Sequence, residues 1–230
     1  MNAMSTFDVK AELFEQLARI GKALGSAYRL QLLDLLAQGE RSVDMLAQLC
    51  QLSVTNTSQH LQHLRRAGLV RARKEGLYVH YRLSGDSVVR LVAAMRAVGE
   101  KHVAEVDKLI KEYLNTKDEL EPVPARELLE RARNGLVTIL DVRPPEEYRA
   151  GHLPGAINIP LPDVSKRVNE LPANREVIAY CRGPYCLMSF EAVTLLRKQG
   201  RNARRLQDGY PEWKLLGLPV EQGSPAPLDR

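Results

Sequence analysis

The chain has 230 residues, a net charge of +5 and an apolar fraction of 44%, which are ordinary values for a globular protein. This length permits one large domain or two of usual size. No stretch approaches the roughly 18 apolar residues of a membrane helix, and the first residues lack an export signal, so we expect a soluble cytoplasmic protein without a membrane partner. Three cysteines, Cys50, Cys181 and Cys186, are too few for a disulfide framework and are expected to stay reduced.

Apolar residues at helical spacing dominate the first third of the chain. They predict four helices, over residues 7–24, 27–38, 43–50 and 54–67. Ser26, Ser42 and Ser53 stand before the last three helices, where a serine side chain is a favoured N-cap. The third and fourth helices are separated by a very short turn, and the fourth is polar outside and basic at its end. This arrangement indicates a helix-turn-helix.

The fourth helix is expected to carry the DNA-reading surface. Val54, Thr57, Leu61 and Leu64 share one face, and the other face is rich in amides and hydroxyls, which can read base edges in a major groove. An ordinary solvated helix face would carry Glu and Lys instead. We predict DNA contacts from Thr55, Asn56, Ser58, Gln59, Gln62, His63 and Arg66, and from Arg73 and Lys74 in the following segment.

Residues 69–84 alternate apolar and polar side chains on both sides of Lys74-Glu75-Gly76, which predicts a β-hairpin. Six basic residues and one acid lie between residues 54 and 82, a footprint typical of phosphate contacts. With this hairpin and the stretch SQHLQHLRRAGLV, residues 7–114 resemble the ArsR family of winged-helix repressors. The resemblance implies a homodimer that binds double-stranded operator DNA near its own promoter and releases it when an inducer is sensed.

One long helix is predicted over residues 86–114, and a partner helix from a second copy would cover its apolar stripe. Many ArsR-type proteins bind metal, but this chain has Ser42 and Asp44 where a cysteine pair would be wanted, and His102 with Glu105 gives too few ligands for a zinc site. We therefore predict no metal and no other cofactor. Cys50 either packs in the core or is a thiol that reports oxidation to the fourth helix.

The fold class predicted is multidomain, with a mainly α winged helix-turn-helix followed by an α/β domain. Strands alternating with helices after residue 124 favour a mostly parallel sheet. The expected divisions are a DNA-binding and dimerisation domain over 1–115, a linker over 116–123, a second domain over 124–220 and a flexible tail over 221–230.

A strand-like run ends at Cys181 and a helical pattern begins five residues later, which places this cysteine in a strand-to-helix loop. Main-chain N–H groups of such a loop, together with the helix start, are expected to favour the thiolate of Cys181 and keep it reactive. The loop residues are Arg182, Gly183, Pro184, Tyr185 and Cys186.

The runs DVRPPEEYRAGHLPGAINIPL, YCRGPYC and DGYPEW closely resemble the rhodanese family over about residues 122–220. The resemblance implies that Cys181 takes up a sulfane sulfur as a persulfide and that the loop residues surround that sulfur. It also implies that Asp141, Arg143 and His152 support the loop. Arg182 is expected to attract an anionic donor such as thiosulfate.

Several readings stay open. Cysteine-based phosphatases need an arginine at the position of Leu187, so sulfur transfer is favoured over phosphate chemistry. Cys186 either attacks a persulfide on Cys181 or simply packs. We predict a repressor whose operator binding responds to thiosulfate or polysulfide. The alternatives are a sulfurtransferase that the winged helix dimerises, a non-catalytic rhodanese-like binding module, and an arsenical sensor that uses Cys181 and Cys186 as a dithiol.

Overall fold

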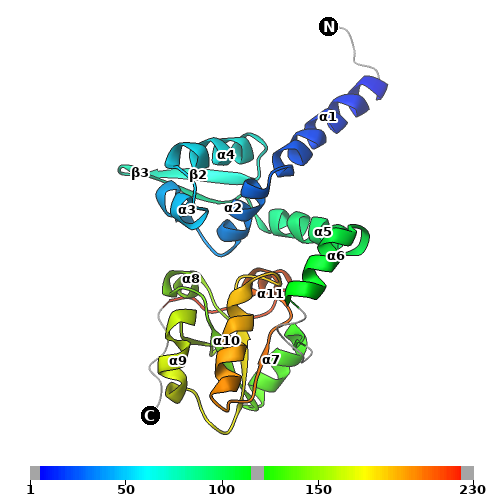
Figure 1. The fold of residues 1–230 in the computed structure, drawn as a ribbon. Coiled ribbons are helices and arrows are strands. Elements are labelled where there is room, and N and C mark those ends of the chain that lie inside the picture. The colour runs from blue at the N-terminus through cyan, green and yellow to red at the C-terminus, as the bar shows by residue number, and fades with distance from the viewer. Residues whose placement is uncertain (1–5, 115–121, 224–230) are drawn as a thin grey trace. The chain divides into compact units, whose positions relative to one another are not determined.

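The computed structural model describes residues 6–114 and 122–223 (Figure 1). Internal contacts divide the chain into two compact units, Met1–Val92 and Ala93–Arg230. The predicted linker over 116–123 lies mostly outside the described residues, as does most of the predicted tail.

The first unit contains the four predicted helices and the predicted hairpin. The helices are α1 (Thr6–Leu24), α2 (Ala27–Ala37), α3 (Val43–Leu49) and α4 (Val54–Arg66). The strands are β1 (Arg41–Ser42), β2 (Val70–Glu75) and β3 (Tyr78–Leu83), joined antiparallel in the order β1-β3-β2. Strand β1 was not predicted, because two residues are too few to show an alternating pattern.

Two of the three predicted N-caps are confirmed. The Ser42 and Ser53 hydroxyls each accept a hydrogen bond from the backbone N–H three residues later, at 3.2 Å. Ser26 also stands at an N-cap, but its side chain makes no capping hydrogen bond among the described residues. The predicted position is therefore right, and the predicted side-chain cap is wrong. Its backbone carbonyl still accepts the N–H of Leu30 at 3.1 Å, which starts α2 without the hydroxyl.

The core of the first unit is formed by apolar side chains of α2, α3, α4 and the hairpin, including Leu32, Leu46, Leu61 and Tyr81. Helix α1 contributes little to it. Leu13, Phe14 and Leu17 are each 60% exposed, so the described residues leave the apolar stripe of α1 uncovered.

The predicted single helix over 86–114 is interrupted. Helix α5 runs over Asp86–His102, Val103 takes an extended conformation with φ −113° and ψ 105°, and α6 (Ala104–Leu109) and a π-helical turn (Ile110–Leu114) follow. The prediction was wrong because no proline or glycine marks the break. Val103 itself is β-branched, which lowers helix propensity only slightly.

The second unit contains a four-stranded parallel sheet in the order β5-β4-β6-β7, which confirms the predicted α/β class. The strands are β4 (Val137–Asp141), β5 (Ile157–Asn158), β6 (Glu176–Tyr180) and β7 (Ala203–Arg205). The helices include α7 (Ala125–Arg133), α8 (Pro145–Ala150), α10 (Leu187–Lys198) and α11 (Tyr210–Leu215). Between β5 and β6, two 3-10 turns flank the short helix α9 (Val164–Arg167).

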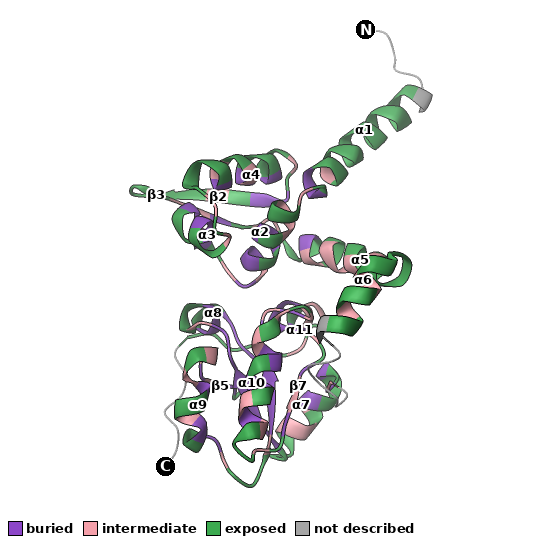
Figure 2. Cartoon of the chain, in the orientation of Figure 1, coloured by how far each residue is buried: buried purple, intermediate pink, exposed green. Residues whose placement is uncertain are grey.

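Both faces of this sheet are covered. Ile139 and Ile178 pack with α7, α8 and α11 in one cluster, whereas Leu140 and Ala179 pack with α9 and α10 in another. Strands β4 and β6 are therefore buried on both sides. Figure 2 shows buried chain, in purple, between the helices of this unit. The loop after β6 consequently begins at the edge of a sheet that is packed on both faces.

Candidate functional site

Helix α4 presents the predicted reading face to solvent. Thr57, Leu61 and Leu64 are fully buried, which turns the opposite side of the helix outward. The outward residues are Thr55, Asn56, Gln59, Gln62, His63 and Arg66, and Ser58 is half-buried at the margin. Val54, predicted on the inner face, is instead 48% exposed, because the first turn of α4 projects beyond the core. DNA contact by these residues stays a prediction.

The hairpin carries a charge cluster that local patterns did not reveal. Gly76 has φ +59° in the turn, and Lys74 lies exposed beside it. Arg73 is also exposed, but its guanidinium contacts Glu40 at 2.6 Å and Glu75 at 2.8 Å. Without DNA, the charge of Arg73 is thus shared between two carboxylates, one of them 33 residues away.

The structure places Cys181 at the carboxyl end of β6, as predicted, but seals it from solvent. Cys181 is 1% exposed, and its Sγ lies 3.3 Å from the Ser189 hydroxyl and 3.4 Å from the Cys186 carbonyl oxygen. Burial, with a further contribution from Cys186, raises the pKa of the Cys181 thiol well above its ordinary value. The structure does not show the accessible thiol that the loop position suggested, and sulfur uptake by Cys181 stays a prediction.

Cys186 has the properties expected of Cys181. It is half-buried at the N-cap of α10, and a hydrogen bond from the Cys181 thiol lowers its pKa to about 7 against the opposing effect of burial. Backbone N–H groups of Arg182 and Met188, and the charge of Arg182, act in the same direction. Backbone N–H groups of the loop thus approach Cys186 and lower its pKa, whereas burial dominates at Cys181.

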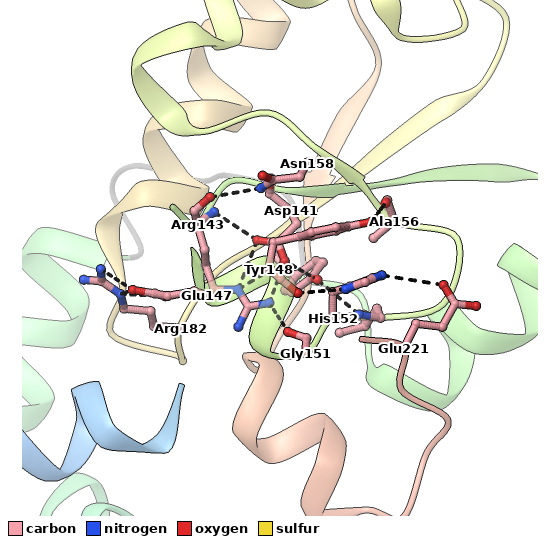
Figure 3. A network of polar contacts seen from close by, with 12 residues as sticks. Asp141, Arg143, Glu147, Tyr148, Gly151, His152, Ala156, Asn158, Arg182 and Glu221 are labelled. Atoms are coloured by element: carbon pink, nitrogen blue, oxygen red, sulfur yellow. Dashed lines mark hydrogen bonds and ion pairs between the residues drawn. The ribbon is translucent and has the colours of Figure 1, made fainter. Parts of the chain in front are cut away.

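Arg182 is held by a buried carboxylate. It donates from Nε and Nη2 to Glu147 at 3.0 and 2.6 Å, and Glu147 is 1% exposed (Figure 3). The expected attraction of an anionic donor by Arg182 is weakened, because its charge is compensated within the site. The bidentate pair instead fixes the start of the loop against α8.

Asp141 and Arg143 form the centre of a buried network under the loop. Both are 0% exposed, and Arg143 donates to Asp141 at 2.6 Å and to the Gly151 carbonyl oxygen at 2.7 Å (Figure 3). The Tyr180 hydroxyl donates to Asp141 and accepts the Leu153 N–H. Since Tyr180 directly precedes Cys181, this network fixes the strand end from which the loop departs.

His152 is buried and makes packing and hydrogen-bond contacts within the domain. Its ring stacks on Tyr148 with 3.6 Å between centroids, and Nδ1 lies 2.8 Å from the Tyr148 carbonyl oxygen (Figure 3). Its backbone pairs with Glu221, and Nε2 lies 3.6 Å from the Glu221 carboxylate. Residue 221, predicted to begin a flexible tail, thus belongs to the packed domain.

The remaining loop residues make contacts that no sequence pattern predicted. A Cβ on Gly209 would lie 2.4 Å from the backbone of Arg182 and Gly183, so this glycine permits the DGYPEW segment to support the loop. The Tyr210 N–H also donates to the Cys181 carbonyl oxygen at 3.2 Å. Gly183 is buried and Pro184 half-buried, while Tyr185 is 43% exposed and donates to Glu100, a residue of the same unit, at 2.6 Å.

Cys50 lies apart from this loop, in the first unit. It is half-buried at the C-cap of α3 and packs against the core, and burial raises its pKa. Within the described ranges, no group of three or more His, Cys, Asp or Glu residues is arranged to hold a metal. No helix of the described residues has the length and apolar character to cross a membrane.

Comparisons with known proteins match both units. Residues 27–72 match the bacterial regulatory proteins of the arsR family, and residues 124–216 match the rhodanese-like domain family. The HTH-type transcriptional regulator Rv0324 of Mycobacterium tuberculosis is 47% identical over 218 residues, covering 95% of this chain and 96% of the relative. A sulfurtransferase of Allochromatium vinosum is 33% identical over 85 residues, which cover 36% of this chain and 78% of that protein.

A solved structure from Mycobacterium bovis, a homodimeric winged helix-turn-helix DNA-binding domain of a possible ArsR-family regulator, is 47% identical. Its TM-score is 0.41, and the match covers 45% of this chain and 94% of that one. The 47% identity to Rv0324 extends over nearly the whole of both chains and therefore includes both domains in one order. The chain belongs to the ArsR family of helix-turn-helix transcriptional regulators, with a rhodanese-like domain following its DNA-binding domain.

Proposed function

We propose that this regulator is a dimeric operator-binding repressor whose rhodanese-like loop accepts sulfane sulfur, and that the sulfur state of the loop changes operator affinity. The observation that carries the proposal is the pair of cysteines within one loop, one sealed and one held by backbone N–H groups. Thiosulfate and polysulfide are the donor classes, since both deliver a sulfur that a thiolate can attack.

Operator binding is supported by two surfaces of the first unit. The outward face of α4 offers amides and hydroxyls that suit base edges, and Lys74 and Arg71 of the hairpin are exposed cations that suit phosphates. Dimer formation is supported by Leu13, Phe14 and Leu17, whose exposure leaves an apolar stripe for a second copy to cover.

Operator release tests the coupling. Full-length protein bound to its operator is treated with polysulfide, and release is compared for the wild type and for Cys181→Ser. We expect release from the wild type and retention of DNA by the variant. Equal release from both proteins excludes a relay through this loop. Because the hydroxyl replaces a buried thiol, circular dichroism and operator binding without polysulfide must first match the wild type.

A second candidate is a sulfurtransferase in which the winged helix only dimerises the enzyme, and the likeness to the A. vinosum sulfurtransferase favours it. Transfer of sulfur from thiosulfate to cyanide measures this activity and separates it from a rhodanese-like module that only binds partners. Salt-dependent, sequence-selective DNA binding separates the repressor from the enzyme, because a dimerisation module has no operator preference.

A further inference from the structure

We propose that helix α5 holds the loop of residues 181–186, the sulfur loop, through Tyr185, and that Arg96 and Glu100 of α5 transmit the sulfur state of this loop to α5. This connection rests on the proposed sulfur uptake by Cys181 and names the contact that carries its effect. The contact lies wholly within the second unit, whereas α5 itself begins in the first unit.

Tyr185 is the loop residue that reaches α5. Its hydroxyl donates to the Glu100 carboxylate at 2.6 Å, and the centroid of its ring lies 5.2 Å from the guanidinium carbon of Arg96. Arg96 and Glu100 are one helical turn apart, so they share one face of α5. Burial and the hydrogen bond to Glu100 raise the pKa of Tyr185, which keeps the phenol protonated and able to donate.

Arg96 also contacts the segment that supports the start of the sulfur loop. Its guanidinium lies 3.0 Å from Glu212 Oε1, and the other oxygen of that carboxylate accepts the Gly209 N–H at 3.2 Å. The side chains of Arg96 and Glu212 are 16% and 15% exposed, so solvent screens this ion pair less than an open surface pair. Because Gly209 lies against the backbone of Arg182, Arg96 is connected to both ends of the sulfur loop.

An added sulfur on Cys181 requires the sulfur loop to move. In the uptake step, the thiol proton passes to solvent and the thiolate attacks a sulfur of polysulfide. A new S–S bond forms, an S–S bond of the donor breaks, and the shortened chain leaves with the bonding electron pair. The new sulfur lies about 2 Å from Cys181 Sγ. Cys181 is 1% exposed, however, and its Sγ already lies 3.3 Å from the Ser189 hydroxyl and 3.4 Å from the Cys186 carbonyl oxygen. Such close packing leaves no volume for another sulfur, so the loop backbone has to shift.

A shift of the sulfur loop changes its contact with α5. Tyr185 directly precedes Cys186, whose carbonyl oxygen borders the Cys181 sulfur, so a displacement of that carbonyl displaces the phenol as well. The hydrogen bond to Glu100 depends on distance and angle and is weakened by this displacement. Helix α5 continues into the first unit, where Val88 is buried in the core, and it thus joins the sulfur loop to the DNA-binding domain.

Hydrogen exchange of the full-length protein tests the connection. Loading with polysulfide, located on Cys181 by mass spectrometry, should make the backbone amides of residues 93–102 exchange at least roughly threefold faster, because this part of α5 loses a contact. Glu100→Gln should exchange faster before loading and change little on loading. Cys181→Ser should show no change with polysulfide. Glu105→Gln, an exposed change in α6, is the matched control and should respond like the wild type.

Operator binding gives a second readout. At equal sulfur loading, the operator Kd of the wild type should rise at least about fivefold, the lower range of allosteric coupling. This ratio should fall toward onefold in Glu100→Gln and in Tyr185→Phe, which keeps the ring and removes only the hydroxyl. The double variant should be no worse than either single variant, because both changes break the same hydrogen bond.

The outcomes separate this connection from the function on which it rests. If the wild type gains sulfur on Cys181 while residues 93–102 exchange at an unchanged rate, or if both variants release operator like the wild type, the connection is overturned, but sulfur-dependent release stands. If the wild type gains no sulfur on Cys181, or keeps its operator after gaining it, the proposed function is overturned, and the connection falls with it.

Circular dichroism, and operator binding without polysulfide, establish that each variant has folded. A variant that fails this check is replaced by Arg96→Lys, which keeps a positive charge beside Glu212 and loses the planar contact with the Tyr185 ring. This variant should also lower the response of residues 93–102 to sulfur loading, and a response equal to that of the wild type would overturn the connection.

Discussion

At the scale of single residues, burial and hydrogen-bond donors give two chemically identical side chains different pKa values. Cys181 and Cys186 lie in one loop, five residues apart, and their pKa values move in opposite directions. The difference in pKa has two causes. Cys181 is shielded from solvent, whereas Cys186 accepts from three hydrogen-bond donors. Position relative to the strand end therefore matters less than which sulfur the N–H groups approach.

This pair gives a pH-dependent prediction. Alkylation of Cys186 by iodoacetamide should rise with pH around a midpoint near 7, the pKa that its hydrogen bonds produce. Cys181→Ala removes the largest of those contributions, so the thiolate is less stabilised and the midpoint should move to higher pH. Mass-spectrometric alkylation rates between pH 5 and pH 10 measure it. An unchanged midpoint would show that the two thiols do not share a proton.

The buried carboxylate of Glu147 gives a prediction about stability. Glu147→Gln removes the charge that compensates Arg182, whose side chain is 20% exposed, and weakens a bidentate contact. We expect the free energy of unfolding of the second unit to fall by about 2–3 kcal/mol. Urea denaturation measures it. Glu146→Gln, on the same helix but exposed, is the matched control and should change stability by less than about 0.5 kcal/mol.

At the scale of elements, the loop is shaped by a segment that follows it in the chain. Gly209 precedes α11 and approaches the backbone of Arg182 and Gly183 more closely than a side chain would permit. The Tyr210 N–H and the Cys181 carbonyl join the same two segments at 3.2 Å. The loop is therefore packed between the end of β6 and the start of α11, and this packing holds it over Cys181.

Gly209→Ala should displace the loop. The added Cβ meets backbone atoms at 2.4 Å, and backbone cannot move aside as a flexible side chain does. We expect a loss of about 1–3 kcal/mol in stability and faster alkylation of Cys181, because the seal opens. Thermal unfolding and thiol alkylation measure the two effects. Gly85→Ala, where a Cβ meets nothing within 4 Å, should change neither.

The hairpin gives a prediction about DNA affinity. Glu40→Gln leaves Arg73 with Glu75 alone, so the guanidinium is freer to contact a phosphate. We expect tighter operator binding and a log–log salt dependence steeper by about 1 for each added phosphate contact. Fluorescence anisotropy at several salt concentrations measures both. Weaker binding by Glu40→Gln would instead mean that the ion pair holds the hairpin in its binding conformation.

At the scale of the whole molecule, short sequence patterns predicted the order of helices and strands, whereas contacts between distant residues determine the surroundings of the two loop cysteines. Ser42, Ser53 and Gly76 mark element ends through interactions with their immediate neighbours, so the sequence alone located the helix-turn-helix and the hairpin. The Arg182–Glu147 pair joins residues 35 positions apart, and the sealing of Cys181 depends on packing against α10. Such contacts leave no periodic pattern, which is why the sequence placed Cys181 in the loop but did not predict its burial.

The apolar stripe of α1 is the surface on which the proposed dimer depends. A second copy must cover Leu13, Phe14 and Leu17 if the protein is to present two recognition helices to successive major grooves. The double variant Leu13→Glu, Leu17→Glu puts charge into that interface and should yield a monomer with sharply reduced operator affinity, whereas sulfur uptake by the second unit should persist. Analytical ultracentrifugation, anisotropy and mass spectrometry measure the three properties. Glu15→Gln, an exposed change on the same helix, should leave all three unaltered, and a double variant that stays dimeric would assign dimerisation to another surface.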